Sequence, residues 1–296
     1  MAAAYVEVPQ GWRRQSSRGF GPFVTREVFG LPDGTRLLWD ARWHRKHAGR
    51  VPGGSTWWAP FAMAWWMGVL FAVGSICFAL GSFPLYATTV GTTPDNVTFF
   101  VGSIFFTTAS FLQYVEVANT PTDLVAAHRN GLGSLLRVQH RRIDWWAAAI
   151  QLLGTLWFNR TTLSALLVGL GASSKHHPIW RPDALGSICF LVSSWLAWAE
   201  ECDGTFAWRP SRISWWITAL NLVGSVAFGV SAVASYVTSS GQLLSLALTN
   251  LGTFVGAVCF LVGAILLLPE RTLEGPDTEP RPGPEPRPAH PVGNGT

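Results

Sequence analysis

The sequence predicts an all-α integral membrane protein whose six transmembrane helices form three tandem hairpins. Hydrophobic residues make up 49% of the 296 residues and charged residues only 13%, whereas an average soluble domain has about 25% charged residues. A bilayer core of about 30 Å needs about 20 apolar residues per helix, and six segments meet this requirement. They are residues 57–80, 97–115, 145–170, 180–199, 214–237 and 246–268.

These segments carry a pattern that occurs three times. A Trp-Trp pair stands eight residues before a glycine in each unit, at Trp66 and Gly74, Trp146 and Gly154, and Trp216 and Gly224. Farther along each unit, a glycine stands fourteen residues before a glutamate, at Gly102 and Glu116, Gly186 and Glu200, and Gly256 and Glu270. The spacing predicts three membrane hairpins over residues 57–116, 145–200 and 214–270.

The positive charges predict the orientation of the hairpins. Of the 21 Lys and Arg residues, 18 fall on one side of the six predicted spans. Only Lys175 and Arg181 flank spans on the other side, and Arg160 falls inside an apolar segment. The positive-inside rule therefore predicts that both termini are cytoplasmic and that the protein lies in the cytoplasmic membrane.

Four segments are predicted to lie on the cytoplasmic side: residues 1–56, 117–144, 201–213 and 271–296. The last is rich in Pro, Glu, Gly and Arg, a composition typical of a disordered tail. The first contains a predicted β-hairpin, with strands Phe23–Phe29 and Thr35–Trp39 joined by a Pro-Asp-Gly turn. The basic run at 42–47 that follows is interpreted as a juxtamembrane anchor, and a lipid-headgroup or metal site is the alternative.

The six glycines of the repeated pattern predict where the helices pack. Each is followed by Ser, Thr or Ala and, four residues after the glycine, by Phe. Glycine and Phe at this spacing share one helix face, and helices in lipid associate through such small-residue notches. Gly74, Gly102, Gly154, Gly186, Gly224 and Gly256 are therefore predicted packing positions, and a polar path lined by Ser is the alternative.

One unit resembles a known family. Trp215-Trp216-Ile217, Asn221, Gly224-Ser225 and Phe228 resemble the YrhK-like domain, a small two-helix bacterial membrane module. The resemblance implies that the chain is bacterial and consists of three fused modules. Thr155 and Ala257 depart from the Gly-Ser step in their copies. A pseudo-threefold ring of six helices is the expected packing, either around a pore or filled by aromatic side chains.

The three repeat glutamates, Glu116, Glu200 and Glu270, are the first candidate functional residues. Each ends a helix on the cytoplasmic side, where the helix dipole is unfavourable for a carboxylate. Arg142 and Arg212 stand four residues before Trp pairs at that face, so we expect Glu-Arg pairing between neighbouring hairpins, although Ala62 holds this position in the first. The alternative is a carboxylate ring that attracts cations to a pore mouth.

Arg160 and Asp183 are the second candidates. A rise of 1.5 Å per residue places Arg160 about 21 Å from Trp146 and Asp183 about 25 Å from Glu200, so the two could pair inside the second hairpin. Intramembrane ionisable residues are functional candidates, and an arginine that snorkels to the interface is the alternative. Gln151 and Asn221 are expected to form interhelical hydrogen bonds, and His176 and His177 fall in an external loop.

The sequence favours a non-enzymatic structural or partner-binding membrane component. No nucleophile–base or metal-ligand spacing indicates an enzyme, and neither a cofactor, a metal nor a nucleic acid is expected. The expected partners are the lipid bilayer and either another membrane protein or a second copy of the chain. The alternative function is permeation of a small solute or cation, with the glutamates at the inner mouth and Arg160 as a selectivity element. A pore requires polar residues along a common axis, whereas a scaffold fills that axis with Phe, Leu and Trp.

Overall fold

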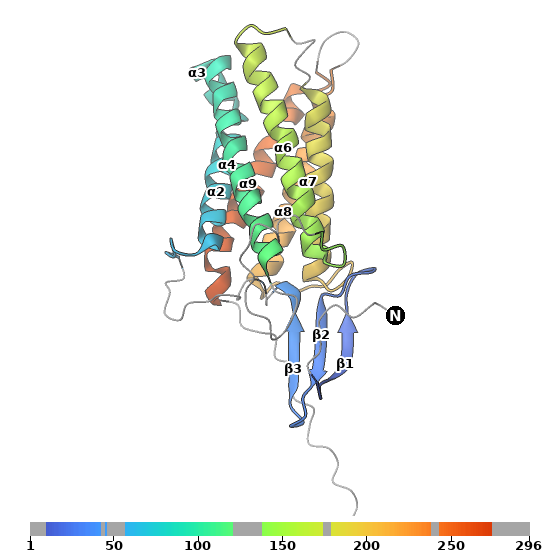
Figure 1. The fold of residues 1–296 in the computed structure, drawn as a ribbon. Helices are drawn as coiled ribbons and strands as arrows, with labels where there is room; N and C mark the ends of the chain where they lie inside the picture. The colour runs from blue at the N-terminus through green and yellow to red at the C-terminus, as the bar shows by residue number, and fades with distance from the viewer. Residues whose placement is uncertain are drawn as a thin grey trace, which may run out of the picture.

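Long helices make up most of the structure, which is a computed structural model that describes residues 10–42, 45, 57–120, 138–173, 179–237 and 243–273, except for the side chains of 271–273. Six helices stand side by side in a bundle, and a small sheet lies beyond one end of it (Figure 1). We call this the sheet end, and the opposite end the far end. Of the tail predicted at 271–296, the first three residues instead continue the last helix, which ends at Leu273, and residues 274–296 lie outside the described residues, as does the His176–His177 pair.

The six long helices form three antiparallel pairs that close into a ring. Their bounds are α2 Met63–Gly81, α4 Thr92–Asn119, α6 Ile143–Gly169, α7 Trp180–Glu201, α8 Ile213–Ala234 and α9 Leu246–Leu273. Within the pairs, α2 packs on α4, α6 on α7 and α8 on α9; between pairs, α4 packs on α6, α7 on α8 and α9 on α2. The first and last helices of the chain are therefore neighbours.

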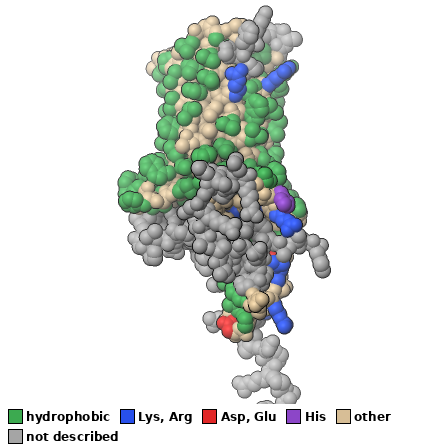
Figure 2. Space-filling view, in the orientation of Figure 1, with side chains coloured by type: hydrophobic (Ala, Val, Ile, Leu, Met, Phe, Trp, Pro, Cys, Tyr) green, Lys and Arg blue, Asp and Glu red, His purple; other side chains and the backbone are tan. Residues whose placement is uncertain are grey.

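Four of these helices, α2, α4, α8 and α9, are long and apolar enough to cross a membrane. Such helices suggest a membrane protein, and hydrophobic side chains cover the visible face of the bundle, with Lys and Arg near its ends (Figure 2). The other two, α6 and α7, are as long but more polar, because α6 contains Asp144 and Arg160 and α7 contains Arg181, Asp183 and two glutamates.

The three helices that carry Trp pairs begin in the same way. The indole Nε1 of the second Trp donates to a carbonyl oxygen six residues earlier: Trp66 to Pro60 at 2.9 Å, Trp146 to His140 at 3.1 Å and Trp216 to Pro210 at 2.9 Å. This contact holds the incoming chain against the first turn. The apolar run predicted a helix from about residue 57, but α2 begins at Met63. Trp57 and Trp58 belong to the incoming chain that this contact holds.

A short helix that the sequence analysis did not predict, α3 (Pro84–Val90), connects α2 and α4 at the far end. Pro84 occupies its first turn, where a missing backbone N–H costs nothing.

Each pair of helices crosses at two glycines from the repeated pattern. A Cβ on Gly102 would come within 2.7 Å of Cys77 Cβ and 3.2 Å of the Gly74 carbonyl oxygen. The same holds in the third pair, where a Cβ on Gly256 would lie 2.7 Å from the Phe228 ring and 3.0 Å from the Gly224 carbonyl oxygen. These backbones approach closely because neither residue has a side chain.

The sheet has the order β1-β2-β3 and is antiparallel, with strands Arg13–Arg18, Arg26–Gly30 and Arg36–Asp40. β2 and β3 fall in the segments where a hairpin was expected. β1 was not predicted, because its fully exposed sequence, Arg-Arg-Gln-Ser-Ser-Arg, has no apolar alternation. The sheet attaches to the loop after α7, where Thr25 Oγ1 donates to Asp203 Oδ1 at 2.8 Å.

Candidate functional site

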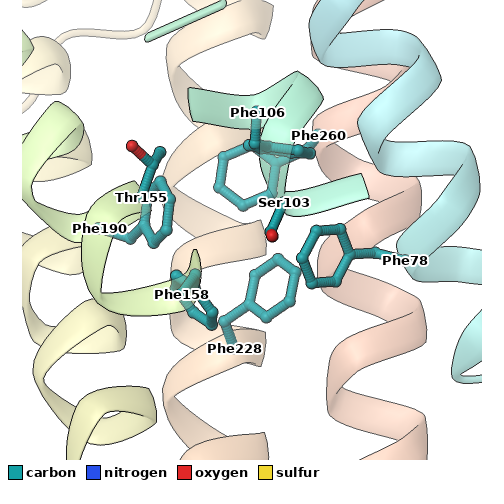
Figure 3. A pocket seen from close by; sticks show the side chains of 8 residues that line it. All are labelled: Phe78, Ser103, Phe106, Thr155, Phe158, Phe190, Phe228 and Phe260. Atoms are coloured by element: carbon teal, nitrogen blue, oxygen red, sulfur yellow. The ribbon is translucent and has the colours of Figure 1, made fainter. Parts of the chain in front are cut away.

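Six phenylalanines fill the centre of the bundle. One comes from each long helix, four residues after the glycine of the pattern, and their rings gather between the helices (Figure 3). Phe78, Phe158 and Phe228 form one triangle, with ring centroids 5.9 to 6.4 Å apart. Phe106, Phe190 and Phe260 form a second, with centroids 5.9 to 6.5 Å apart. We call the two stacked triangles the phenylalanine prism.

The prism leaves almost no free space along the axis of the bundle. The cavity among its rings, which Ser103 and Thr155 also line, measures about 10 Å³. One water molecule needs roughly 10–15 Å³ of such volume. The hydroxyls beside the rings are occupied, because Ser103 Oγ and Thr162 Oγ1 share a hydrogen bond of 2.9 Å and Thr155 Oγ1 donates to the Leu152 carbonyl oxygen. The axis is therefore blocked at this level.

A larger cavity lies on the sheet side of the prism. It measures about 60 Å³, and residues of all six long helices line it. Phe71 and Phe260 face it from the prism side, and Arg42 and Arg45 from the sheet side. We call this cavity the vestibule. Its remaining lining includes three amide side chains, Gln113, Gln151 and Asn221, each from a different helix pair.

Arg42 and Arg45, which directly follow β3, lie at the sheet end among buried carboxylates. Arg42 Nη2 donates to Glu270 Oε1 at 2.7 Å, and Arg42 Nε lies 3.6 Å from Glu201 Oε2. The two arginines thereby connect the N-terminal sheet to the ends of α7 and α9.

Arg45 extends the same contacts to α6. Its Nη1 donates to Asp144 Oδ2 at 2.7 Å and to Glu200 Oε1 at 2.9 Å, and its Nη2 to Glu200 Oε2 at 3.1 Å. Both arginines and all four of these carboxylates are buried. We call this group, with Arg142 and Arg212, the ion-pair cluster.

Arg142 and Arg212, the arginines expected to pair with repeat glutamates, lie in the cluster but contact other partners. Arg142 donates from Nε to Asp144 Oδ1 at 3.0 Å and from Nη1 to the Val117 carbonyl oxygen at 2.9 Å. Arg212 Nε lies 3.4 Å from Glu201 Oε1. The expected pairing between neighbouring hairpins thus occurs at Glu201, one residue after the repeat glutamate.

Burial raises the pKa values of the carboxyl groups in the cluster, whereas the neighbouring arginines lower them. Burial raises the pKa of Glu201 to about 7, although Arg42 and Arg212 lower it. Burial also raises the pKa of Asp144, but the adjacent Arg142 and Arg45 outweigh it and hold that pKa at about 2. Arg42 and Arg45, despite burial, have raised pKa values because of the carboxylates around them. Glu116, which lines the vestibule, is one of the charges acting on Arg45.

Arg160 and Asp183 do not form the ion pair that the sequence analysis considered. Within the described residues no salt bridge joins them. Asp183 Oδ2 instead accepts a hydrogen bond at 3.3 Å from Oγ of Ser235, the residue that follows α8, and Arg160 is half-buried. The helix-length argument placed both residues near the far end but gave no information on which helix each side chain faces.

Two of the central residues were not identified as site residues from the sequence. Arg42 and Arg45 belong to a basic run interpreted as a membrane anchor, and nothing in the run itself distinguishes a buried arginine from a lipid-facing one. The signal that could have found them is the excess of carboxylates at the helix ends, which needs compensation. In the described part of the chain, no group of His, Cys, Asp and Glu could hold a metal ion.

Comparisons with protein-family models, with curated proteins and with solved structures found no match. The function is therefore argued from the prism, the vestibule and the ion-pair cluster.

Proposed function

We propose that the protein is a non-enzymatic, six-span protein of a bacterial cytoplasmic membrane, built from three YrhK-like hairpins, that serves as a structural or partner-binding component. The observation that carries the proposal is the phenylalanine prism. A conduit needs a continuous polar axis, whereas six aromatic rings fill this axis and leave about 10 Å³.

The surfaces of α6 and α7 support six spans. Their outward side chains are large and apolar, including Leu153, Leu156, Leu185, Ile188 and Trp195, all exposed. Gln151 and Ser194, by contrast, turn inward and line the vestibule. A helix whose polar residues face the bundle interior can lie in lipid with a lower total hydropathy. The α6–α7 pair also stands in the ring between α4 and α8, which are both apolar enough to cross a membrane.

The sheet end is the cytoplasmic end in this proposal. Of the Lys and Arg residues, 18 of 21 fall on that side, which the positive-inside rule assigns to the cytoplasm. The ion-pair cluster lies there too, with its carboxylates compensated by four arginines.

Permeation of a small solute or cation is the second candidate function, and the vestibule favours it. In this case the repeat glutamates would form an entrance. The contacts of Glu200 and Glu270 with arginines weigh against an attractive ring, and permeation would require both the prism and the cluster to move.

A flux measurement in liposomes distinguishes the two functions. We expect purified wild-type protein to conduct no cations across several ions and voltages, and the matched lipid-facing variant Phe111→Ala to behave in the same way. The triple variant Phe106→Ala, Phe190→Ala, Phe260→Ala removes one triangle of the prism and tests whether the rings form the barrier. Its correct folding is checked by circular dichroism and gel filtration.

Cation flux through the wild-type protein would overturn the structural function. If that flux were lost in the triple variant Glu116→Gln, Glu200→Gln, Glu270→Gln, the carboxylates would be assigned to a pore entrance and permeation would become the function.

A further inference from the structure

The vestibule presents three amide side chains that no group in the described part of the chain binds. Gln113, Gln151 and Asn221 line the cavity, and within the described residues no hydrogen bond joins their side chains to the protein. They come from α4, α6 and α8, so each helix pair contributes one. Gln151 and Asn221 are the eighth residues after the first residues of their helices, about 12 Å from the sheet end.

These half-buried amides remain available to bind a partner in the cavity. Each has two N–H donors and one carbonyl acceptor, and leaving such groups unpaired away from bulk water costs about 1–3 kcal/mol. The neighbouring hydroxyls do not fill the need, because Ser194 Oγ is bonded to Ser225 Oγ at 2.6 Å and Thr218 Oγ1 donates to the Ser214 carbonyl oxygen. Gly263 adds to the space, since a Cβ there would lie 3.2 Å from Asn221 Oδ1.

The charges around the vestibule select against an ion. Arg42 and Arg45 face it, but both are engaged by buried carboxylates, and Glu116 lies within electrostatic range of Arg45. A charged ligand would have to leave water for a cavity whose own charges already compensate one another, which is costly. A neutral ligand has no such penalty.

The volume limits the size of the ligand. At roughly 10–15 Å³ for each water-sized group, about 60 Å³ accommodates about four to six heavy atoms. The prism lies on one side of the cavity, and Arg42 and Arg45 lie on the other.

We propose that the vestibule is a binding site for one small uncharged solute that both donates and accepts hydrogen bonds, such as a short amide or polyol, held by Gln113, Gln151 and Asn221. The site lies within the bundle, between the prism and the ion-pair cluster. It is independent of the structural function proposed above, which would remain if the site bound nothing but water.

Thermal unfolding of the full-length protein in lipid nanodiscs tests the site. Acetamide and glycerol are the probes, acetate is a control for charge at the size of acetamide, and sorbitol is a control for size. We expect acetamide or glycerol at about ten times its dissociation constant to raise the Tm by about 3 °C. We expect the triple variant Gln113→Leu, Gln151→Leu, Asn221→Leu to lose this rise. The variant Asn159→Leu removes an amide of α6 that does not line the vestibule and should keep it.

Three results would overturn the proposal: equal Tm shifts in the wild type and the triple variant, no shift at any concentration, or a shift with acetate as large as that with acetamide. If the triple variant does not fold, solid-state NMR of the wild type in lipid replaces it. Magnetisation transfer from ¹³C-acetamide or ¹³C-glycerol to the side-chain amides of these three residues would support the proposal. Transfer from water alone would overturn the proposal, because it would show that the cavity holds only water.

Discussion

The phenylalanine prism and the ion-pair cluster lie on the same axis of the bundle but are constructed in opposite ways. The prism takes one ring from the same position of each long helix, and its contacts repeat around the axis. The cluster takes its central cations, Arg42 and Arg45, from a segment outside the bundle, and each contacts a different set of carboxylates.

The difference shows how a repeated chain can fill its centre but not neutralise its end. Identical apolar groups can meet at an axis, because ring contacts are attractive in several orientations. Three identical carboxylates cannot do so, because like charges close together oppose one another. The repeat supplies part of the opposite charge through Arg142 and Arg212, and the non-repeated segment that carries Arg42 and Arg45 supplies the rest.

Removal of Arg45 should have the largest effect. Arg45→Met leaves Asp144 and Glu200 buried without this partner, and breaking a buried ion pair costs about 3–5 kcal/mol. We expect the free energy of unfolding in mild detergent to fall by this amount, measured by denaturant titration. The control Arg36→Met changes an exposed arginine of β3 and should alter stability by less than about 0.5 kcal/mol.

A double variant sharpens this prediction. Glu200→Gln should partly rescue Arg45→Met, because it removes one of the uncompensated charges. If the two losses of stability simply added, Arg45 and Glu200 would not be coupled and the cluster would not act as a unit.

A methyl group at a helix crossing should have a smaller effect. Gly256→Ala places a Cβ 2.7 Å from the Phe228 ring and 3.0 Å from a carbonyl oxygen of the facing backbone. Overpacking of this kind costs about 1–3 kcal/mol. The control Gly229→Ala lies in α8 with nothing within 4 Å, and it should leave the Tm unchanged or raise it. Equal Tm values for the two variants would contradict the close crossing.

The smallest effect per step of the titration is a dependence of stability on pH that arises from Glu201. Burial and, to a lesser extent, Asp40 raise its folded pKa to about 7 despite Arg42 and Arg212, whereas its ordinary pKa is near 4.5. The folded protein therefore binds a proton that the unfolded chain releases between these values. Stability from this group is complete below about pH 4.5 and is lost as pH rises through 7, with a slope of at most about 1.4 kcal/mol per pH unit.

Denaturant titrations between pH 5 and 8 measure this slope. Glu201→Gln should flatten the profile, since the amide has no proton to lose. Asp144 contributes a pH dependence of the opposite sign. Because its folded pKa is lowered to about 2, its contribution to stability is lost as pH falls from about 4 through 2. An unchanged slope in Glu201→Gln would assign the pH dependence to another group.

The helices and their packing positions could be predicted because they depend on local sequence. Hydrophobic length indicated the helical segments, and the Gly–Phe spacing indicated which face meets the neighbour. The start of α2 was misplaced because Trp57 and Trp58 are as apolar as the helix but belong to the chain before it. Composition alone does not mark that boundary.

The site could be predicted only in part, because its contacts span long stretches of sequence. The glutamates were singled out from spacing, whereas Gln151 and Asn221 were expected to form interhelical hydrogen bonds and instead line the vestibule without one among the described residues. Gln113 was not identified from the repeat, because Phe71 occupies the position of the first pair that corresponds to Gln151 and Asn221. The amide of that pair comes from its second helix, α4, instead. The partners of Arg42 and Arg45 lie 99 to 228 residues away along the chain, and no local pattern reports such contacts.

The contact between Arg42 and Glu270 has a consequence for the biosynthesis of the protein. Arg42 precedes every helix of the bundle and leaves the ribosome first, whereas Glu270 lies in the last helix to be translated. The ring also closes only when α9 packs against α2. Until the third hairpin is made, the ring therefore has an open edge and Arg42 lacks its contact with Glu270, and the third hairpin completes both at once. A chain that ends before α9 can make neither contact, so the last helix to be synthesised fixes both the first helix and the segment that precedes it.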